Sequence, residues 1–394
     1  MKLDLNKFLY SISFALDLAE NEILNVSSFH SKRVAFIAIQ LAQFLNFTDE
    51  EKFDLYSYAL LHDNGILEAY QNDIKDVNES FKDHCIIGEN NIQAFPFLTK
   101  SKDIILYHHE HYDGSGFFGK KGDEIPLMSQ VIFLADKLDT QFNLKNITYE
   151  IKTEIEKFLT KNSSKLFSPF LVSKFLELSQ QFSFWGSLEY FYTTNQSEIL
   201  QSSYKVEVSM DEFLHITNIL SNLIDSKSKF TAAHSKELAS KSKKVIEYFN
   251  FDENHQKKIL ISANLHDIGK LGTPLNILDK NGPLNNSEVF EIKKHAYFTY
   301  KILEGIDFCD DILHWASSHH EKPDGSGYPF GLKGQDLSIE ARIISCLDFY
   351  QALVETRPYR KAMEHSNAIN IMKNTLRDFD TDIEIINVID NVFK

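Results

Sequence analysis

Apolar residues recur along the chain at the spacing of one helix face rather than in the strict alternation of a strand. Leu55, Tyr58, Ala59 and His62, for example, follow the i, i+3, i+4, i+7 pattern. The same period continues through nearly the whole sequence. It predicts an all-α protein.

Two of the predicted helices carry a His-Asp pair in their last turn. The first begins at Thr48, which stands three residues before a glutamate in the spacing of a capping box, and is expected to end near Gly65. The second runs from near Asp252 to near Gly269. Adjacent side chains on a helix point about 100° apart. The two members of each pair can therefore reach different sides of one metal cluster.

Both helices belong to an internal repeat of metal-binding residue types. Seven histidines and aspartates occur twice in the same order, 204 to 212 positions apart. The second set is His234, His266, Asp267, His295, His319, His320 and Asp348. The first set is His30, His62, Asp63, His84, His108, His109 and Asp136. Imidazole and carboxylate are ligands of borderline-hard divalent metals, so we predict a metal site in each half of the chain.

The repeat divides the 394 residues into two domains of ordinary size. We expect two tandem helical bundles, residues 1–182 and 205–394, joined by a helical connector at 183–204. The connector is rich in aromatic residues, whose rings are costly to leave in water, so it is expected to pack between the domains. The alternative is that these rings form a homodimer contact.

Composition narrows the range of partners. A net charge of −15 argues against long nucleic acid bound through a general basic surface, so we expect a small ligand. The three cysteines occupy no repeated position and fit buried thiols in a reducing cytoplasm. The amino terminus lacks a signal-peptide core, and no apolar run approaches the ~20 residues of a membrane span. A soluble, cytoplasmic protein with no membrane contact is expected.

Seven ligands are too many for one ion of four to six ligands. A carboxylate such as that of Asp267 can bridge two ions, so two divalent ions are expected in the second domain. No thiolate takes part, which favours iron or manganese over structural zinc. The remaining five histidines have no counterpart in the other copy and are expected to be ordinary core or surface residues. They are His111, His215, His255, His314 and His365.

The second set lies within two longer motifs. Residues 266–270 read HDIGK, and residues 319–329 read HHEKPDGSGYP. These motifs resemble the HD-GYP subclass of the HD-domain phosphohydrolases, whose mark is the Gly-Tyr-Pro triplet after a double histidine. The resemblance covers the whole second domain and, in weaker form, the first. It implies two HD domains and hydrolysis of cyclic di-GMP to linear pGpG and, in some members, on to GMP.

The resemblance also implies how the second set divides between two ions. His234, His266, Asp267 and Asp348 would hold one ion, and Asp267, His295, His319 and His320 would hold the other. A hydroxide between the ions would attack phosphorus in line. Some family members hold a third metal through a glutamate four residues before the first histidine. Here that residue is Phe230, so two ions rather than three are expected.

Four further residues are expected to meet the substrate. Lys270 follows His266 by one helical turn, so its ammonium can reach the scissile phosphate or the leaving oxygen. Tyr328 belongs to the Gly-Tyr-Pro triplet. Arg357 and Arg360 can offer fork-shaped donors to a second phosphate. The alternative for these two arginines is an ordinary place on a solvated turn.

The first domain keeps the seven ligand types but has lost the groups that would handle a substrate. The lysine of HDIGK is replaced by Ile66. The interval from His62 to His84 is seven residues shorter than that from His266 to His295. We expect a regulatory or structural relative of the second domain that still binds metal; the alternative is a second working active site.

Two other functions stay open. The chain could bind a cyclic dinucleotide or a signalling partner protein without turning the ligand over. It could also hydrolyse another cyclic dinucleotide, such as cyclic GMP-AMP. The intact Lys270, Tyr328 and ligand set favour an enzyme over a receptor.

Overall fold

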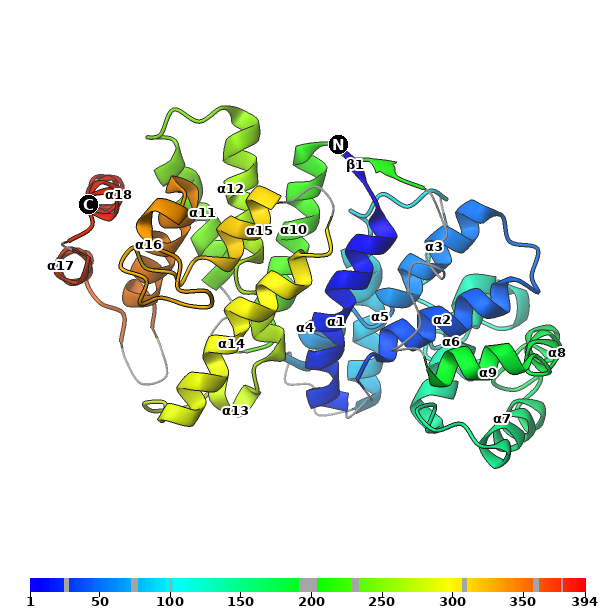
Figure 1. Ribbon diagram of the computed structural model, residues 1–394. Helices are drawn as coiled ribbons and strands as arrows, with labels where there is room; N and C mark the ends of the chain where they lie inside the picture. Colours follow the sequence, from blue (N-terminus) through cyan, green and yellow to red (C-terminus); the bar gives the residue numbers. More distant parts are fainter. Residues whose placement is uncertain are drawn as a thin grey trace. The chain divides into compact units, whose positions relative to one another are not determined.

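The computed structural model describes most of the chain, and its helices are shown in Figure 1. The described residues are 1–24, 28–71, 77–99, 101–190, 204–228, 234–306, 310–356, 361–376 and 378–394. They are mainly helical, with one two-stranded antiparallel sheet that pairs β1 (Lys2–Leu3) with β2 (Val206–Glu207). The prediction of an all-α protein is confirmed.

The chain divides into two compact units, Lys2–Glu207 and Val208–Lys394, the second together with Met1. In the first unit α2 packs against both α3 and α6, and α4 packs against α5. Its helices are α1 (Leu5–Leu24), α2 (His30–Ala42), α3 (Asp49–Leu60), α4 (Ile66–Gln71), α5 (Val77–Ile92), α6 (Leu127–Gln141), α7 (Tyr149–Lys161), α8 (Pro169–Leu178) and α9 (Phe182–Glu189), with the short η1 (Gly122–Glu124).

In the second unit α12 packs against α10, α11 and α15, while α16 packs against α11 and α18. Its helices are α10 (Met210–Asp225), α11 (His234–Ile246), α12 (Glu253–Leu265), α13 (Leu275–Leu278), α14 (Asn286–Leu303), α15 (Asp310–Ser317), α16 (Ile339–Val354), α17 (His365–Thr375) and α18 (Asp380–Phe393), with the short η3 (Ile268–Gly272) and η4 (Gly334–Asp336).

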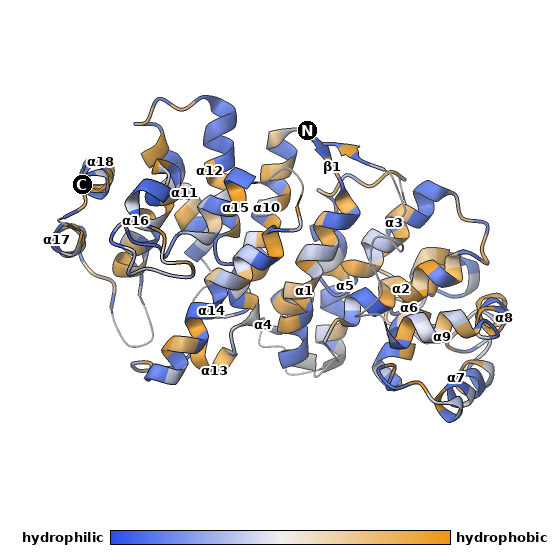
Figure 2. Ribbon diagram, viewed as in Figure 1, coloured by the Kyte–Doolittle hydropathy of each residue, from blue (hydrophilic) through white to orange (hydrophobic). Residues whose placement is uncertain are grey.

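Hydrophobic and hydrophilic residues both occur along each helix, as expected for helices with one apolar and one polar face (Figure 2). The apolar face of α16 supplies Ile343, Ile344 and Leu347 to the core of the second unit, where all three are fully buried. The equivalent helix of the first unit, α6, buries Val131 and Leu134. Each unit thus has a core of its own, and one ligand-bearing helix runs through it.

The predicted capping box at the start of α3 is present. The Thr48 hydroxyl accepts from the Glu51 backbone N–H at 3.2 Å, and the Glu51 carboxylate accepts from the Thr48 N–H at 2.8 Å. The helix ends earlier than expected, at Leu60 rather than near Gly65. The His-Asp pair therefore lies in the turn after the helix, where Nδ1 of His62 lies 2.9 Å from the Ala59 carbonyl oxygen of α3.

The first part of the predicted connector belongs to the first unit. The Phe184 ring stacks on Phe36 at a centroid distance of 6.2 Å and meets Phe175 edge-on at 5.8 Å. The indole N–H of Trp185 donates to the Ser179 carbonyl at 2.8 Å. Residues 191–203 of the connector lie outside the described residues. No described helix is both long and apolar enough to cross a lipid bilayer.

Candidate metal centres

The structure brings the seven residues of the second set together. They come from α11, the turn after α12, α14, the turn after α15, and α16. Their ligand atoms form three overlapping groups in which all atoms lie within 4.8 Å of one another. The groups are His234 with His266 and Asp348, His295 with His319 and His320, and Asp267 with His266 and His319.

Asp267 lies between the two halves of this set. Its Oδ2 is 3.2 Å from Nε2 of His266 and 3.9 Å from Nε2 of His234. Its Oδ1 is 3.5 Å from Nε2 of His295 and 3.7 Å from Nε2 of His319. One carboxylate therefore faces a different pair of imidazoles with each oxygen, which is the arrangement that a bridging ligand requires.

The tautomers of three histidines are set by the backbone. In His266, His295 and His319 the Nδ1 atom lies 2.6 to 2.7 Å from the carbonyl oxygen three residues earlier. A carbonyl can only accept, so each Nδ1 carries the proton and each Nε2 presents a lone pair to the centre of the set. Nε2 of His266 and Oδ1 of Asp267 are buried and make no hydrogen bond with the described residues. These atoms fit a bound metal ion.

Burial and charge shift the pKa values of several ligands toward the protonation states that metals need. Burial lowers the pKa of His295 to about 4 and that of His320 to about 3, so both rings are neutral near pH 7. Burial alone would raise the pKa of Asp267, but attraction to His266 and Lys270 outweighs it and holds that pKa well below its ordinary value. His295 and His320 therefore present neutral imidazoles beside an ionised carboxylate, the combination that a divalent cation prefers. At His234, hydrogen bonds to Asp348 and Glu355 outweigh burial and raise the pKa to about 9.

Two of the predicted substrate residues lie beside the set. The Lys270 ammonium contacts Oδ2 of Asp267 and is partly exposed. The Tyr328 ring lies 4.8 Å from that of His320, and its backbone N–H donates to the His320 carbonyl at 3.2 Å. Phe230, Arg357 and Arg360 lie outside the described residues.

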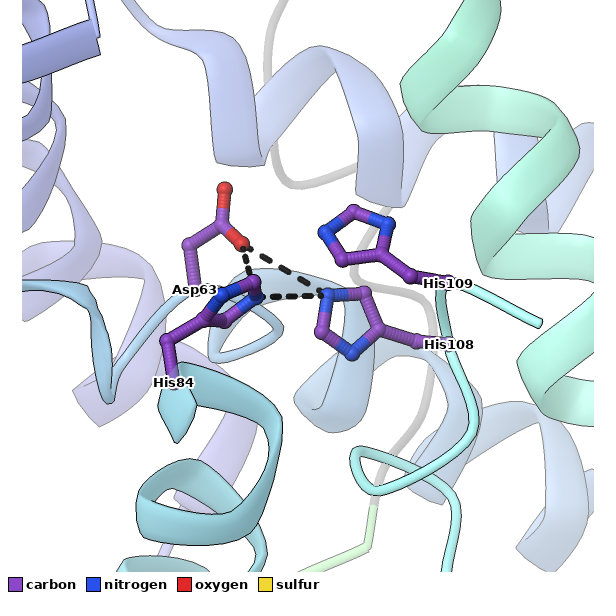
Figure 3. Close-up of side chains that lie close together, drawn as sticks. All are labelled: Asp63, His84, His108 and His109. Carbon is purple, nitrogen blue, oxygen red and sulfur yellow. Dashed lines mark hydrogen bonds and ion pairs between the residues drawn. The ribbon is translucent and has the colours of Figure 1, made fainter. Parts of the chain in front are cut away.

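The first set is arranged in the same way, and Figure 3 shows four of its members. Oδ2 of Asp63 is 3.2 Å from His62 and 3.9 Å from His30. Its Oδ1 is 3.3 Å from His84 and 3.6 Å from His108, each measured to Nε2. His109 joins the group formed by Asp63, His84 and His108, while Asp136 lies 3.5 Å from His30. All seven residues of the first set are thus also brought together.

Known proteins resemble the chain over both units. Models of the HD domain match residues 28–141 and 218–383. The chain is 30% identical over 399 residues to 3'3'-cGAMP-specific phosphodiesterase 1 of Vibrio cholerae, covering 98% of this chain and 91% of that protein. It is 31% identical to 3'3'-cGAMP-specific phosphodiesterase 3 of the same organism, covering 76% of this chain and 64% of the relative.

A more distant relative is the cyclic di-GMP phosphodiesterase response regulator RpfG of Xanthomonas campestris, which is 33% identical over 42% of this chain and 44% of that protein. The chain belongs to the HD-GYP family. The crystal structure of the V. cholerae cyclic GMP-AMP phosphodiesterase V-cGAP3 has the same fold, with a TM-score of 0.69 at 22% identity over 100% of this chain and 99% of that one. The prediction of two tandem HD domains is confirmed.

In both HD units a glycine sets the distance between two ligand-bearing segments. Gly269 follows the His-Asp pair, and a Cβ there would overlap the carbonyl oxygen of His295 and lie 2.7 Å from the Thr299 backbone nitrogen. A Cβ on Gly65 would overlap the His84 carbonyl oxygen in the same way. The turn and the next ligand helix therefore meet backbone to backbone, which only glycine permits.

The two units support their first histidine differently, and sequence reasoning missed the carboxylates that do so. Nδ1 of His30 lies 2.7 Å from Asp139, whose carboxylate also accepts from Arg33. Nδ1 of His234 lies 3.2 Å from Glu355 instead. Glu355 stands one helical turn further along the chain than the counterpart of Asp139. Because Glu355 does not align with Asp139, comparison of the two sequence copies did not reveal it.

In the second unit a glutamine and a glutamate occupy the places of Asp139 and Arg33. Gln351 corresponds to Asp139, and its side-chain amide donates to Glu237, which corresponds to Arg33, at 2.8 Å. The buried ion pair of the first unit is thus replaced by a neutral amide and a carboxylate. The acidic partner of the histidine has moved to a new position to compensate.

A glutamate beside the double histidine holds the loop that follows it in each unit. The Glu321 carboxylate accepts backbone N–H groups from Phe330 at 2.6 Å, Gly331 at 3.1 Å and Leu332 at 3.0 Å. The Glu110 carboxylate accepts from the corresponding loop of the first unit, including the Phe118 N–H at 2.8 Å. The motif contains Glu321, but only the folded loop reveals its role.

Proposed function

We propose that the second unit is a metal-dependent phosphodiesterase that opens a cyclic dinucleotide by hydrolysis. The observation that carries this proposal is the place of Asp267, whose two oxygens each face a different pair of imidazoles. The N/O ligands of the second set would hold two divalent ions, with iron or manganese as the expected metals. Such ions supply a hydroxide near neutral pH and spread the charge of the phosphoryl oxygens.

The chain's own groups would orient the substrate and hold protons. Lys270 lies at the edge of the ligand set with its ammonium on Asp267, and 18% of its side chain is exposed. From that place it would bind a phosphate oxygen or stabilise the leaving oxygen. The Tyr328 ring lies beside those of His320 and His295 and would limit the position of the bound nucleotide. Arg357 and Arg360 would bind a second phosphate.

The similar proteins change which of the two candidate substrates we place first. The sequence motif alone placed cyclic di-GMP first and kept cyclic GMP-AMP as an alternative. The relatives similar over most of the chain are named as 3'3'-cGAMP-specific, whereas RpfG matches less than half of it. We therefore propose 3'3'-cGAMP as the preferred substrate.

The first unit would hold metal without hydrolysing the substrate. Ile66 stands in the place of Lys270 and is buried, so an apolar side chain replaces the ammonium that would contact a phosphate or a leaving oxygen. The loop between the second and third histidines is seven residues shorter than in the second unit. Both differences fall on substrate handling and leave the ligands intact.

The test is metal analysis of the purified full chain combined with chromatography of the products from 3'3'-cGAMP and cyclic di-GMP. We expect bound divalent metal, a linear dinucleotide as product, and faster turnover of 3'3'-cGAMP. Metal-loaded protein that binds both nucleotides and forms no product would instead show a receptor. Faster hydrolysis of cyclic di-GMP would reverse the proposed preference.

A further inference from the structure

A cavity of about 640 Å³ opens onto the ligand set of the first unit. Four of its lining residues belong to that set: His30, Asp63, His109 and Asp136. Its volume lies in the range of small-molecule sites, roughly 300 to 1,000 Å³. A unit that has lost its catalytic lysine thus still has room for a ligand beside its proposed metals.

The rim of this cavity is cationic. Lys137 and Lys145 both line it. Asp136 and Asp139 also lie there, but each is engaged: Asp136 contacts Lys137 at 3.3 Å, and Asp139 is held by Arg33 and His30. The carboxylates are therefore largely neutralised by protein partners. Lys145 remains to attract an anion, and metal ions bound by Asp136 would release Lys137 to do the same.

The walls carry aromatic rings that the second unit lacks at the same positions. Phe81 lines the cavity, and its ring lies 5.6 Å from that of His84 and 5.9 Å from that of His109. Its counterpart in the second unit is Ile292. Phe142 also lines the cavity, and its counterpart is Val354. Aromatic faces of this kind bind nucleobases by stacking.

One of the two rim lysines also differs from its counterpart, whereas the other, Lys145, corresponds to a cation, Arg357. Lys137 corresponds to Phe349 in the second unit. Asn143, another lining residue, corresponds to Glu355, the carboxylate on His234. The first unit has therefore exchanged an aromatic residue for a cation and a carboxylate for a neutral amide. Both changes favour an anionic ligand.

We propose that this cavity binds a phosphate-bearing nucleotide without hydrolysing it. Lys137 and Lys145 hold the phosphate, and Phe81 and Phe142 provide surfaces for a base. Ile66 replaces the lysine that would assist cleavage in the second unit. The ligand is either the cyclic dinucleotide itself or its linear product, which share this chemistry. The site is separate from the proposed catalytic centre and reports the concentration of one of the two.

The experiment is titration calorimetry on the full chain with two probes: a non-hydrolysable phosphorothioate 3'3'-cGAMP and the linear dinucleotide with a 5'-phosphate. We expect two binding events per chain with at least one probe. The probe that gives the second event identifies the source of the ligand. Because a charge-assisted hydrogen bond contributes ~1.5–3 kcal/mol, Lys137→Ala and Lys145→Ala should each weaken one event about tenfold or more and leave the other unchanged.

Two kinds of variant make the result decisive. Lys157→Ala with Lys161→Ala removes two lysines of α7 that do not line the cavity, and should change neither event. Phe142→Val, which installs the residue of the second unit, should weaken the same event as the lysine variants. Thermal unfolding of every variant identifies any that fails to fold.

One binding event per chain with both probes would overturn the proposal. Two binding events that are both unchanged by substitution of Lys137, Lys145 and Phe142 would overturn it as well. Hydrolysis of 3'3'-cGAMP is followed in the same samples. A single binding event in a chain that still hydrolyses 3'3'-cGAMP would contradict only the nucleotide site of the first unit. Two binding events in a chain that does not hydrolyse 3'3'-cGAMP would contradict only the proposed catalytic function.

Discussion

Asp63 and Asp267 occupy the same place in their units, and their four distances to the surrounding imidazoles differ by at most 0.2 Å between the units. Beyond the ligands the two sites diverge. A lysine touches Asp267, whereas the corresponding residue of the first unit is a buried isoleucine. The comparison teaches that the His/Asp arrangement is kept even where the cation beside it is replaced. Under the proposed function, that cation decides whether a phosphate is cleaved.

The largest effect is expected from Asp267→Ala. Removal of the proposed bridging carboxylate should release at least one metal ion and lower hydrolysis by a factor of ~10³ or more, because the nucleophile depends on those ions. Product chromatography and metal analysis measure the two effects. The stricter form, His266→Ala with Asp267→Ala, should leave no activity; about half the wild-type rate would mean that the first unit is also a working enzyme.

The second-largest effect is expected from a substitution that lowers catalysis without changing metal binding. Lys270→Ile gives the second unit the residue that the first unit already has. It should lower kcat by a factor of ~10²–10³, the usual result of removing one group that stabilises transition-state charge, while metal content stays unchanged. The reverse change, Ile66→Lys, should not create activity in the His266→Ala, Asp267→Ala background, because the shortened loop remains. Unchanged kcat in Lys270→Ile would contradict the role given to this lysine.

A smaller effect is expected from the carboxylate that contacts Nδ1 of His234. Glu355→Gln removes the carboxylate at Nδ1 of His234 and should weaken metal binding about 10- to 100-fold, as loss of such a partner usually does. Adding Glu237→Arg and Gln351→Asp to this variant copies the arrangement of the first unit and should recover part of the affinity. Metal titration of the apoprotein measures both. No recovery would mean that Glu355 acts through other contacts.

The smallest effect is expected from His62→Ala with Asp63→Ala. This pair of changes removes the central ligands of the first set. Hydrolysis by the second unit should stay within a few-fold of the wild-type rate, while the metal content of the full chain falls and thermal unfolding shifts downward, since a bound metal stabilises the folded state. Complete loss of hydrolysis in a variant that remains folded would show that the first site takes part in the chemistry.

Much of this arrangement could be read from the sequence, because helical period and ligand spacing are local properties. Thr48 and its partner three residues on predict a capping box, and the repeated histidines and aspartates predict which residues converge. The early end of α3 at Leu60 could not be predicted in the same way. The turn that carries His62 and Asp63 meets the backbone of α5 at Gly65, a contact that lies 19 residues away in sequence at His84.

The supporting carboxylates escaped sequence reasoning for a related reason. Asp139 lies three residues after Asp136, one helical turn away, which is a signal that could have found it. Glu355 stands seven residues after Asp348, so no alignment of the two copies pairs it with Asp139. A residue that supports a ligand can move to another turn of a helix and still reach the same atom. Only a structure shows that it has done so.

The main-chain contact at Gly65 and Gly269 has a consequence for how such a duplicated protein can change. Because the His-Asp turn and the next ligand helix meet through backbone atoms, this spacing does not require particular side chains at the contact other than the glycine itself. A copy relieved of selection for turnover can then vary its lysines, loops and aromatic residues one at a time without first losing its capacity for metal. Such a copy is a stable starting point for a new specificity, in natural divergence or in the laboratory.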